Sequence, residues 1–204
     1  LDHTAGELRS DAVTGRVRVG IPDEYARTIL PGVISRFTQA HPRVEVSVRC
    51  GFSTDFPALL ERGELDLAVH AVERRDENAI CLREEKTVWA TSSRHLAHER
   101  RPLPVALFDR ACWWRERAVE ALEASGLRYH VAFSSESVNG VRAAIEAGAA
   151  IGLLGESSLG DGLRVLTAEE GFPHVPSSEL VLDHRGAGSK AAMAMRQAIM
   201  DAFA

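Results

Sequence analysis

Side chains that could contact a small molecule lie immediately after predicted strands at four points in the chain. The candidates after the first strand are Pro22, Asp23, Glu24 and Tyr25; after the second, Phe52, Ser53 and Thr54; after the third, His70; and after a later strand, Ser135 and Ser137. Small ligands bind at the carboxyl ends of the strands in open α/β sheets. Helix N-termini at that edge add free N–H groups and partial positive charge, which favour anions and polar ligand atoms.

Each candidate also has a structural role open to it. Asp23 can cap the helix that follows, because its carboxylate can accept backbone N–H groups, and Ser53 or Thr54 can cap the next helix in the same way. Glu24 and Tyr25 can face solvent in a first helical turn, and His70 can be a polar residue leaving a sheet. The sequence leaves these alternatives open.

Motifs of enzymes and metal sites are incomplete in this chain. Gly155-Glu156-Ser157-Ser158-Leu159 lacks the final glycine of a nucleophile elbow. His95 and His98 have helical spacing, but no third metal ligand is near them in the sequence. We therefore expect no catalytic residue, no metal and no cofactor, and Asp23 with His70 is the one pair that an enzyme could use.

Three tryptophans, Trp89, Trp113 and Trp114, are large apolar side chains outside the candidate set. Tryptophan buries much apolar area and usually contributes to packing. We therefore expect all three to pack inside the protein rather than to stack on a ligand.

Composition excludes several classes of protein. The chain has 204 residues and a formal net charge of −5, whereas a free-standing DNA-binding domain is normally basic. No apolar run approaches the roughly 20 residues of a membrane span, so we expect no membrane partner.

Cys50, Cys81 and Cys112 are odd in number and widely spaced, which favours a reducing cytoplasm over a disulfide framework. The first residue is Leu1 rather than methionine, which suggests a fragment or a processed form.

The order of predicted elements indicates two α/β lobes. Strands with alternating apolar residues and two amphipathic helices form two βαβ units over residues 16–70, which predicts a parallel sheet. Residues 80–91 form one long extended segment without a preceding helix, and residues 94–104 look like a polar turn region. Further elements are predicted as a helix at 118–125, a strand at 129–133, a helix at 138–147, a strand at 150–154, extended chain at 163–166 and 179–183, and a closing helix at 190–203.

Several short motifs occur together in a familiar order. They are Gly15-Arg16-Val17-Arg18-Val19-Gly20, Leu30-Pro31, His41-Pro42-Arg43-Val44, Gly63-Glu64-Leu65-Asp66-Leu67-Ala68-Val69 and Ala147-Gly148-Ala149-Ala150-Ile151-Gly152-Leu153-Leu154. With this order and spacing, residues 15–204 resemble the effector-binding region of LysR-type transcriptional regulators. The chain departs from the family pattern at Gly155, where proline is usual, and at Asp23 and Glu24, where small or hydroxyl residues are frequent. The two acids favour hydroxyl or amine groups on the effector.

The resemblance implies a fold like the type 2 periplasmic binding proteins: two Rossmann-like lobes joined by two crossover strands, with a ligand cleft between them. Lobe I would comprise residues 14–86 and 183–204, lobe II residues 87–182, and residues 1–13 would be the remnant of a linker helix. It also implies a homodimer or tetramer, with the helix at about 26–40, including Val33 and Phe37, against the second lobe of a partner. DNA would be bound only through an N-terminal helix-turn-helix absent from this chain.

We therefore interpret the sequence as a cytoplasmic ligand sensor that binds a small organic effector and controls a transcription factor. The alternative is a solute-binding protein of a transporter with the same fold. A third class, an enzyme on the same scaffold, would need Asp23 and His70 to act as acid and base.

Overall fold

The strands form two separate five-stranded sheets in the computed structural model, which describes residues 12–109, 113–184, 186 and 188–204. The strand orders are β2-β1-β3-β10-β4 and β7-β6-β8-β5-β9. The chain divides into two compact units, of which unit 1 holds the described residues up to His70, Asn78–Leu82 and those from Leu182 onward. Unit 2 holds Ala71–Glu77 and the described residues of Arg83–Val181. The predicted linker remnant lies almost entirely outside the described residues.

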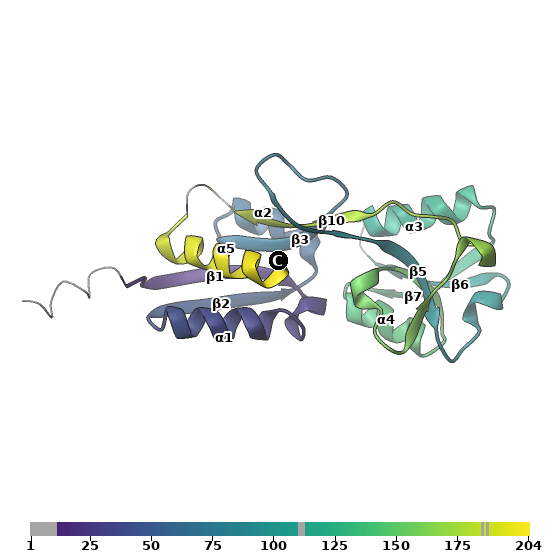
Figure 1. Cartoon of the computed structure of the whole chain (residues 1–204). Coiled ribbons are helices and arrows are strands. Elements are labelled where there is room, and N and C mark those ends of the chain that lie inside the picture. The colour runs from purple at the N-terminus through teal and green to yellow at the C-terminus, as the bar shows by residue number, and fades with distance from the viewer. Residues whose placement is uncertain (1–11, 110–112, 185, 187) are drawn as a thin grey trace, which may run out of the picture. The chain divides into compact units, whose positions relative to one another are not determined.

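Unit 1 is built on the two predicted βαβ units, which the structure confirms. Strands β1 (Gly15–Pro22), β2 (Val44–Gly51) and β3 (Leu67–Val72) are parallel, and β1 lies between the other two. Helices α1 (Leu30–Ala40) and α2 (Phe56–Glu61) make the crossovers, and β10 (Ser178–His184) and β4 (Ile80–Glu85) complete the sheet. The closing helix α5 (Lys190–Phe203) has the predicted bounds and packs on α1 and β1 (Figure 1).

The starts of helices α1 and α2 differ from the prediction. Asp23–Ala26 form a 3₁₀ turn, η2, and α1 begins only at Leu30, next to Pro31, which favours the first helical turn. Ser53–Asp55 likewise form a 3₁₀ turn, η3, before α2. Neither α-helix has a side-chain cap, so the structure excludes the alternative that Asp23, Ser53 or Thr54 caps them.

The Asp66 carboxylate joins β3 to β1. It accepts hydrogen bonds from the Arg18 backbone N–H at 2.7 Å and from the Arg18 guanidinium at 2.6 and 3.1 Å. Burial by itself would raise the pKa of the Asp66 carboxyl, but these hydrogen bonds and the Arg18 charge outweigh it and hold the pKa below its ordinary value of 3.8. The charged carboxylate is therefore stabilised in the folded state.

Replacing Asp66 by asparagine is expected to lower the free energy of unfolding by about 1 kcal/mol near neutral pH, because charge-assisted hydrogen bonds become neutral ones. A carboxylate with a lowered folded pKa contributes stability above its unfolded pKa, and this contribution is lost as the pH falls through the folded pKa. The gap between parent and variant in urea unfolding should thus shrink below the ordinary value of 3.8. An equal gap at neutral and acid pH would contradict this account. Exposed Glu61→Gln is the control.

Unit 2 contains β5 (Thr87–Ser92), β6 (Leu103–Phe108), β7 (Tyr129–Ser135), β8 (Ile151–Gly155) and β9 (Leu163–Val165). Strand β6 is parallel to β7 and β8, whereas β5 is antiparallel to β8 and β9. Helices α3 (Trp113–Ala124) and α4 (Val138–Glu146) pack against β6 and β8, and the short 3₁₀ turns are η4 (Ala97–Glu99), η5 (Glu156–Ser158) and η6 (Ala168–Glu170). Trp89 is confirmed as a core residue, 2% exposed.

Three elements around this sheet were wrongly predicted. Strand β6 occupies part of the expected polar turn region; all six of its residues are buried, so it lacks the alternation by which half-buried strands are recognised. The single expected extended segment at 80–91 is divided at Lys86 into β4 and β5, which belong to different sheets. Helix α3 begins at Trp113 rather than at Ala118.

Candidate functional site

The parallel strands of unit 1 bring most of the candidate residues to one edge of its sheet. Pro22 pairs with Gly51, so the η2 turn after β1 and the η3 turn after β2 begin at the same level. On the other side of β1, Gly20 pairs with Ala68 of β3. His70 lies two residues after Ala68 and Pro22 two residues after Gly20, so His70 and Pro22 are at the same level along the sheet. The eight candidates of unit 1 are therefore gathered at the carboxyl edge, as the sequence predicts.

The η2 turn is anchored in the core of unit 1 by Tyr25. This side chain is 5% exposed, and its ring meets the Phe203 ring edge-on, with centroids 5.8 Å apart and planes at 76°. Tyr25 therefore does not face solvent, and its contact with α5 fixes the turn. Asp23 and Glu24 are half-buried on the same turn, where a bound molecule could reach them.

The remaining candidates of unit 1 differ in exposure. Phe52 and Ser53 are half-buried and Thr54 is exposed, whereas His70 is 7% exposed, with its Nε2 3.8 Å from Asp183 Oδ2. Burial and the nearby Asp23 charge raise the pKa of the Cys50 thiol. This thiol is therefore protonated at neutral pH and is a poor nucleophile.

The two serine candidates lie at the corresponding edge of unit 2. Ser135 ends β7, and its Oγ accepts the Ser137 backbone N–H at 3.1 Å. Ser137 caps α4, since its Oγ accepts the backbone N–H groups of Asn139 at 3.1 Å and Gly140 at 3.4 Å. A Cβ at Gly140 would lie 2.2 Å from Ser135 Oγ, so the close approach of β7 and α4 requires glycine. Both serines thus have structural roles at the start of α4.

A buried carboxylate at this edge was missed by sequence reasoning. Glu85, 6% exposed, accepts the Ser157 backbone N–H at 2.8 Å through Oε1, and its Oε2 lies 2.8 Å from Arg83 Nη2. The Glu85 side chain therefore holds the η5 turn, which directly follows β8. A Cβ at Gly155 would lie 3.0 Å from Glu85 Oε1. Gly155, which stands where the family usually has proline, makes room for the Glu85 carboxylate. This glycine was the only feature of the sequence that could have indicated a buried acid here.

One histidine of the incomplete metal motif, His98, has other partners in the structure. His98 Nε2 lies 3.0 Å from Arg164 Nη2, and His98 Nδ1 lies 3.5 Å from Thr91 Oγ1. Nε2 therefore accepts from the guanidinium rather than facing a metal. Within the described part of the chain, no group of three or more His, Cys, Asp or Glu residues could hold a metal ion.

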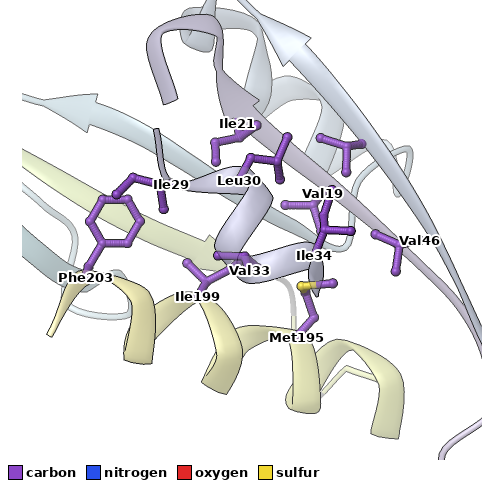
Figure 2. A pocket seen from close by; sticks show the side chains of 11 residues that line it. Val19, Ile21, Ile29, Leu30, Val33, Ile34, Val46, Met195, Ile199 and Phe203 are labelled. Atoms are coloured by element: carbon purple, nitrogen blue, oxygen red, sulfur yellow. The ribbon is translucent and has the colours of Figure 1, made fainter. Parts of the chain in front are cut away.

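An apolar pocket, partly open to solvent, lies between α1, α5 and the strands β1 and β2. Figure 2 shows aliphatic side chains of both helices and of β1 pointing into it, with Phe203 at one end. Its lining is Val19, Ile21, Ile29, Leu30, Val33, Ile34, Val46, Val48, Met195, Ile199 and Phe203. None of these side chains has a polar group that could orient a polar effector, so the pocket is part of the packing of unit 1.

The apolar face of α1 is used within the unit. Val33 and Phe37 are each 2% exposed, and Val33 lines the pocket beneath α5. The expectation that these two side chains contribute to a contact with a partner is therefore wrong. Among the described residues, no helix combines the length and the apolar character needed to cross a bilayer.

Comparison with known proteins adds to this geometry. The chain is 26% identical over 181 residues to the HTH-type transcriptional regulator PecT of Dickeya dadantii (strain 3937), covering 89% of this chain and 57% of PecT. It is 28% identical over 181 residues to the HTH-type transcriptional regulator DgdR of Burkholderia cepacia, covering 89% of this chain and 62% of DgdR. The chain thus spans less than two thirds of these relatives.

Solved structures confirm the predicted fold of two α/β lobes, like that of type 2 periplasmic binding proteins. The effector binding domain of QuiR in complex with shikimate superposes with a TM-score of 0.70 at 14% identity, over 93% of this chain and 97% of that domain. The sequence model of the LysR substrate binding domain matches residues 10–204. Because this match covers nearly the whole chain, the chain belongs to the LysR substrate binding domain family.

Proposed function

We propose that this chain is the ligand-sensing region of a LysR-type transcriptional regulator, which binds a small organic effector and thereby controls the DNA-binding activity of the full-length protein. Membership of the LysR substrate binding domain family carries the proposal. The relatives PecT and DgdR are transcriptional regulators, and the QuiR domain holds shikimate, a small polar organic molecule. The gathering of eight candidates, seven of them polar or aromatic, at one sheet edge supports it further.

The proposed effector site is the predicted set at the carboxyl edges of the two sheets, with residues 14–86 and 183–204 forming lobe I and residues 87–182 lobe II. The half-buried Asp23, Glu24 and Ser53 supply polar groups from the first lobe, and Ser135 and Ser137 from the second. An effector that binds one arrangement of the lobes more tightly than another shifts the population toward it. That shift would be transmitted to the DNA-binding part.

Partners of the full protein follow the same proposal. DNA would be bound through an N-terminal helix-turn-helix outside this chain, which agrees with the net charge of −5 here. We also propose a homodimer or tetramer in the cytoplasm. The edge strand β7 supports self-association, because Val131 is 44% exposed and Phe133 38% exposed on it.

The sensor is favoured over the two other functions. A solute-binding protein would share the fold, but PecT and DgdR are named as transcriptional regulators. For an enzyme, His70 and Asp23 would have to act together, and His70 instead lies 3.8 Å from Asp183. We expect no turnover of a bound effector.

A thermal-shift screen of small metabolites tests this proposal. A ligand at 100 times its Kd stabilises the folded state by about 2.7 kcal/mol. Ser53→Ala and Asp23→Ala should blunt the shift given by a hit without unfolding the protein, because each removes one polar contact from the proposed site. Exposed Ser93→Ala is the matched control and should respond like the parent. If Ser53→Ala and Asp23→Ala also respond like the parent to every hit, the site is misplaced.

A further inference from the structure

Two adjacent tryptophans begin helix α3, shortly after strand β6 ends. Trp114 packs against the core of unit 2, and its ring centroid lies 6.4 Å from that of Phe108, the last residue of β6. The ring of Trp113 lies on that of Trp114, with centroids 4.5 Å apart and planes at 37°. Both side chains are partly exposed. Trp113 is therefore the outer ring of a stack whose inner ring is fixed by the core.

This stack lies at the same edge of the sheet as the serine candidates. Strand β6 is parallel to β7 and β8, so Phe108, Ser135 and Gly155 end neighbouring strands on one side, and Phe108 pairs with Ser135. The proposed effector site of unit 2 is at that edge. Trp114 contacts Phe108 at the end of β6 and Trp113 stacks on Trp114, so the pair of rings lies near this edge of the sheet.

The first turns of α3 carry two arginines, of which Arg115 joins the helix to β6. Arg115 Nη1 donates to the Phe108 carbonyl oxygen and so fastens the helix to the end of β6. Arg117 pairs with Glu73 and, at 2.7 Å, with Glu120. The Arg115 hydrogen bond and the packing of Trp114 against the core position the stack, and a preorganised aromatic surface loses little conformational entropy on binding a ligand.

The chemistry of such a surface selects flat molecules. Indole is the largest π-system among the side chains, and it prefers offset-stacked or edge-on contact with another ring. Trp89, by contrast, is 2% exposed inside the core and can offer no such surface. Binding sites for small molecules are lined mainly by apolar and aromatic side chains, with a few polar groups that set orientation. Trp113 would supply the aromatic part, next to the polar serines.

We infer that Trp113 is a stacking surface within the effector site and that the effector carries a planar, unsaturated ring. This inference rests on the proposed sensor function and goes beyond it by naming a class of effector. It differs from the expectation from sequence that Trp113 only packs inside the protein.

Matched pairs of flat and saturated probes test the inference. One pair is benzylamine with cyclohexylmethylamine, and the other is benzoate with cyclohexanecarboxylate. Within each pair the ring shape differs while the charge is the same. Binding is measured by thermal shift and by tryptophan fluorescence. In at least one pair the flat member should bind about tenfold more tightly. Trp113→Leu keeps apolar bulk but removes the π-system and should abolish this preference, whereas Trp113→Phe should retain most of it. Leu96→Ala, at an apolar residue 61% exposed in the same unit, should change nothing.

Other results separate the two proposals. Three results would overturn the planar-ring inference and leave the sensor function standing. The first is equal binding of both members in both pairs, and the second is that neither flat probe binds while a non-planar metabolite does. The third is an unchanged preference for the flat member in Trp113→Leu. If no compound of the probe set or the metabolite screen stabilises the protein, the sensor function fails and this inference fails with it.

Discussion

Replacing Glu85 by alanine is expected to lower the free energy of unfolding by about 3 kcal/mol, the lower end of the range for breaking a buried ion pair. Glu85 is 6% exposed and its carboxylate serves both the Ser157 N–H and the Arg83 guanidinium. Without it, the Ser157 N–H at the start of η5 loses its acceptor, and Arg83, whose side chain is 34% exposed, loses its counter-charge. The change is read from urea unfolding. Exposed Glu84→Ala is the control and should stay within about 0.5 kcal/mol of the parent.

A double-mutant cycle with Gly155 gives this prediction a sharper test. Gly155→Ala alone should cost about 1–3 kcal/mol, because the new methyl group would stand 3.0 Å from Glu85 Oε1 and 3.1 Å from Glu85 Cγ. In the Glu85→Ala background the obstacle is gone, so the same substitution should cost much less. Strictly additive effects would show that Gly155 is glycine for another reason. The cycle would also show whether glycine is required at position 155 because Glu85 is buried beside it.

Replacing Ile199 by alanine should lower the free energy of unfolding by about 2–5 kcal/mol. Ile199 is 2% exposed on α5 and lines the apolar pocket between α5 and α1. Removing the larger part of this side chain would leave a cavity between the two helices. Urea unfolding of the whole chain measures this loss of stability.

Met193 provides the matched comparison on the same helix. Its side chain is 44% exposed, so Met193→Ala should change the free energy of unfolding by no more than about 0.5 kcal/mol. Equal losses in the two variants would mean that α5 responds to helix propensity rather than to burial in the pocket. A loss confined to Ile199→Ala supports the packing shown in Figure 2.

Local patterns in the sequence were sufficient where an element depends on its own residues. The alternation of Val17, Val19 and Ile21 predicts β1, and the apolar spacing of residues 190–203 predicts α5. The structure adds that Ser189 caps α5, since its Oγ accepts the Ala192 N–H at 3.1 Å. The ordered motifs of the family led to the two-lobe fold. The position of the candidates at strand ends also followed, because parallel strands bring their carboxyl ends to one edge.

Contacts between residues distant in the chain decided the rest. Tyr25 is buried because its ring meets Phe203, 178 positions later, and Glu85 holds the Ser157 N–H across 72 positions. Strand β6 is buried on all sides by other elements, so its own residues carry no alternation that would show it. The sequence does not distinguish Trp113 from Trp114. In the structure Trp114 packs against the core of unit 2, and Trp113 stacks on Trp114 from outside. These features depend on which segments meet in space, which no local pattern records.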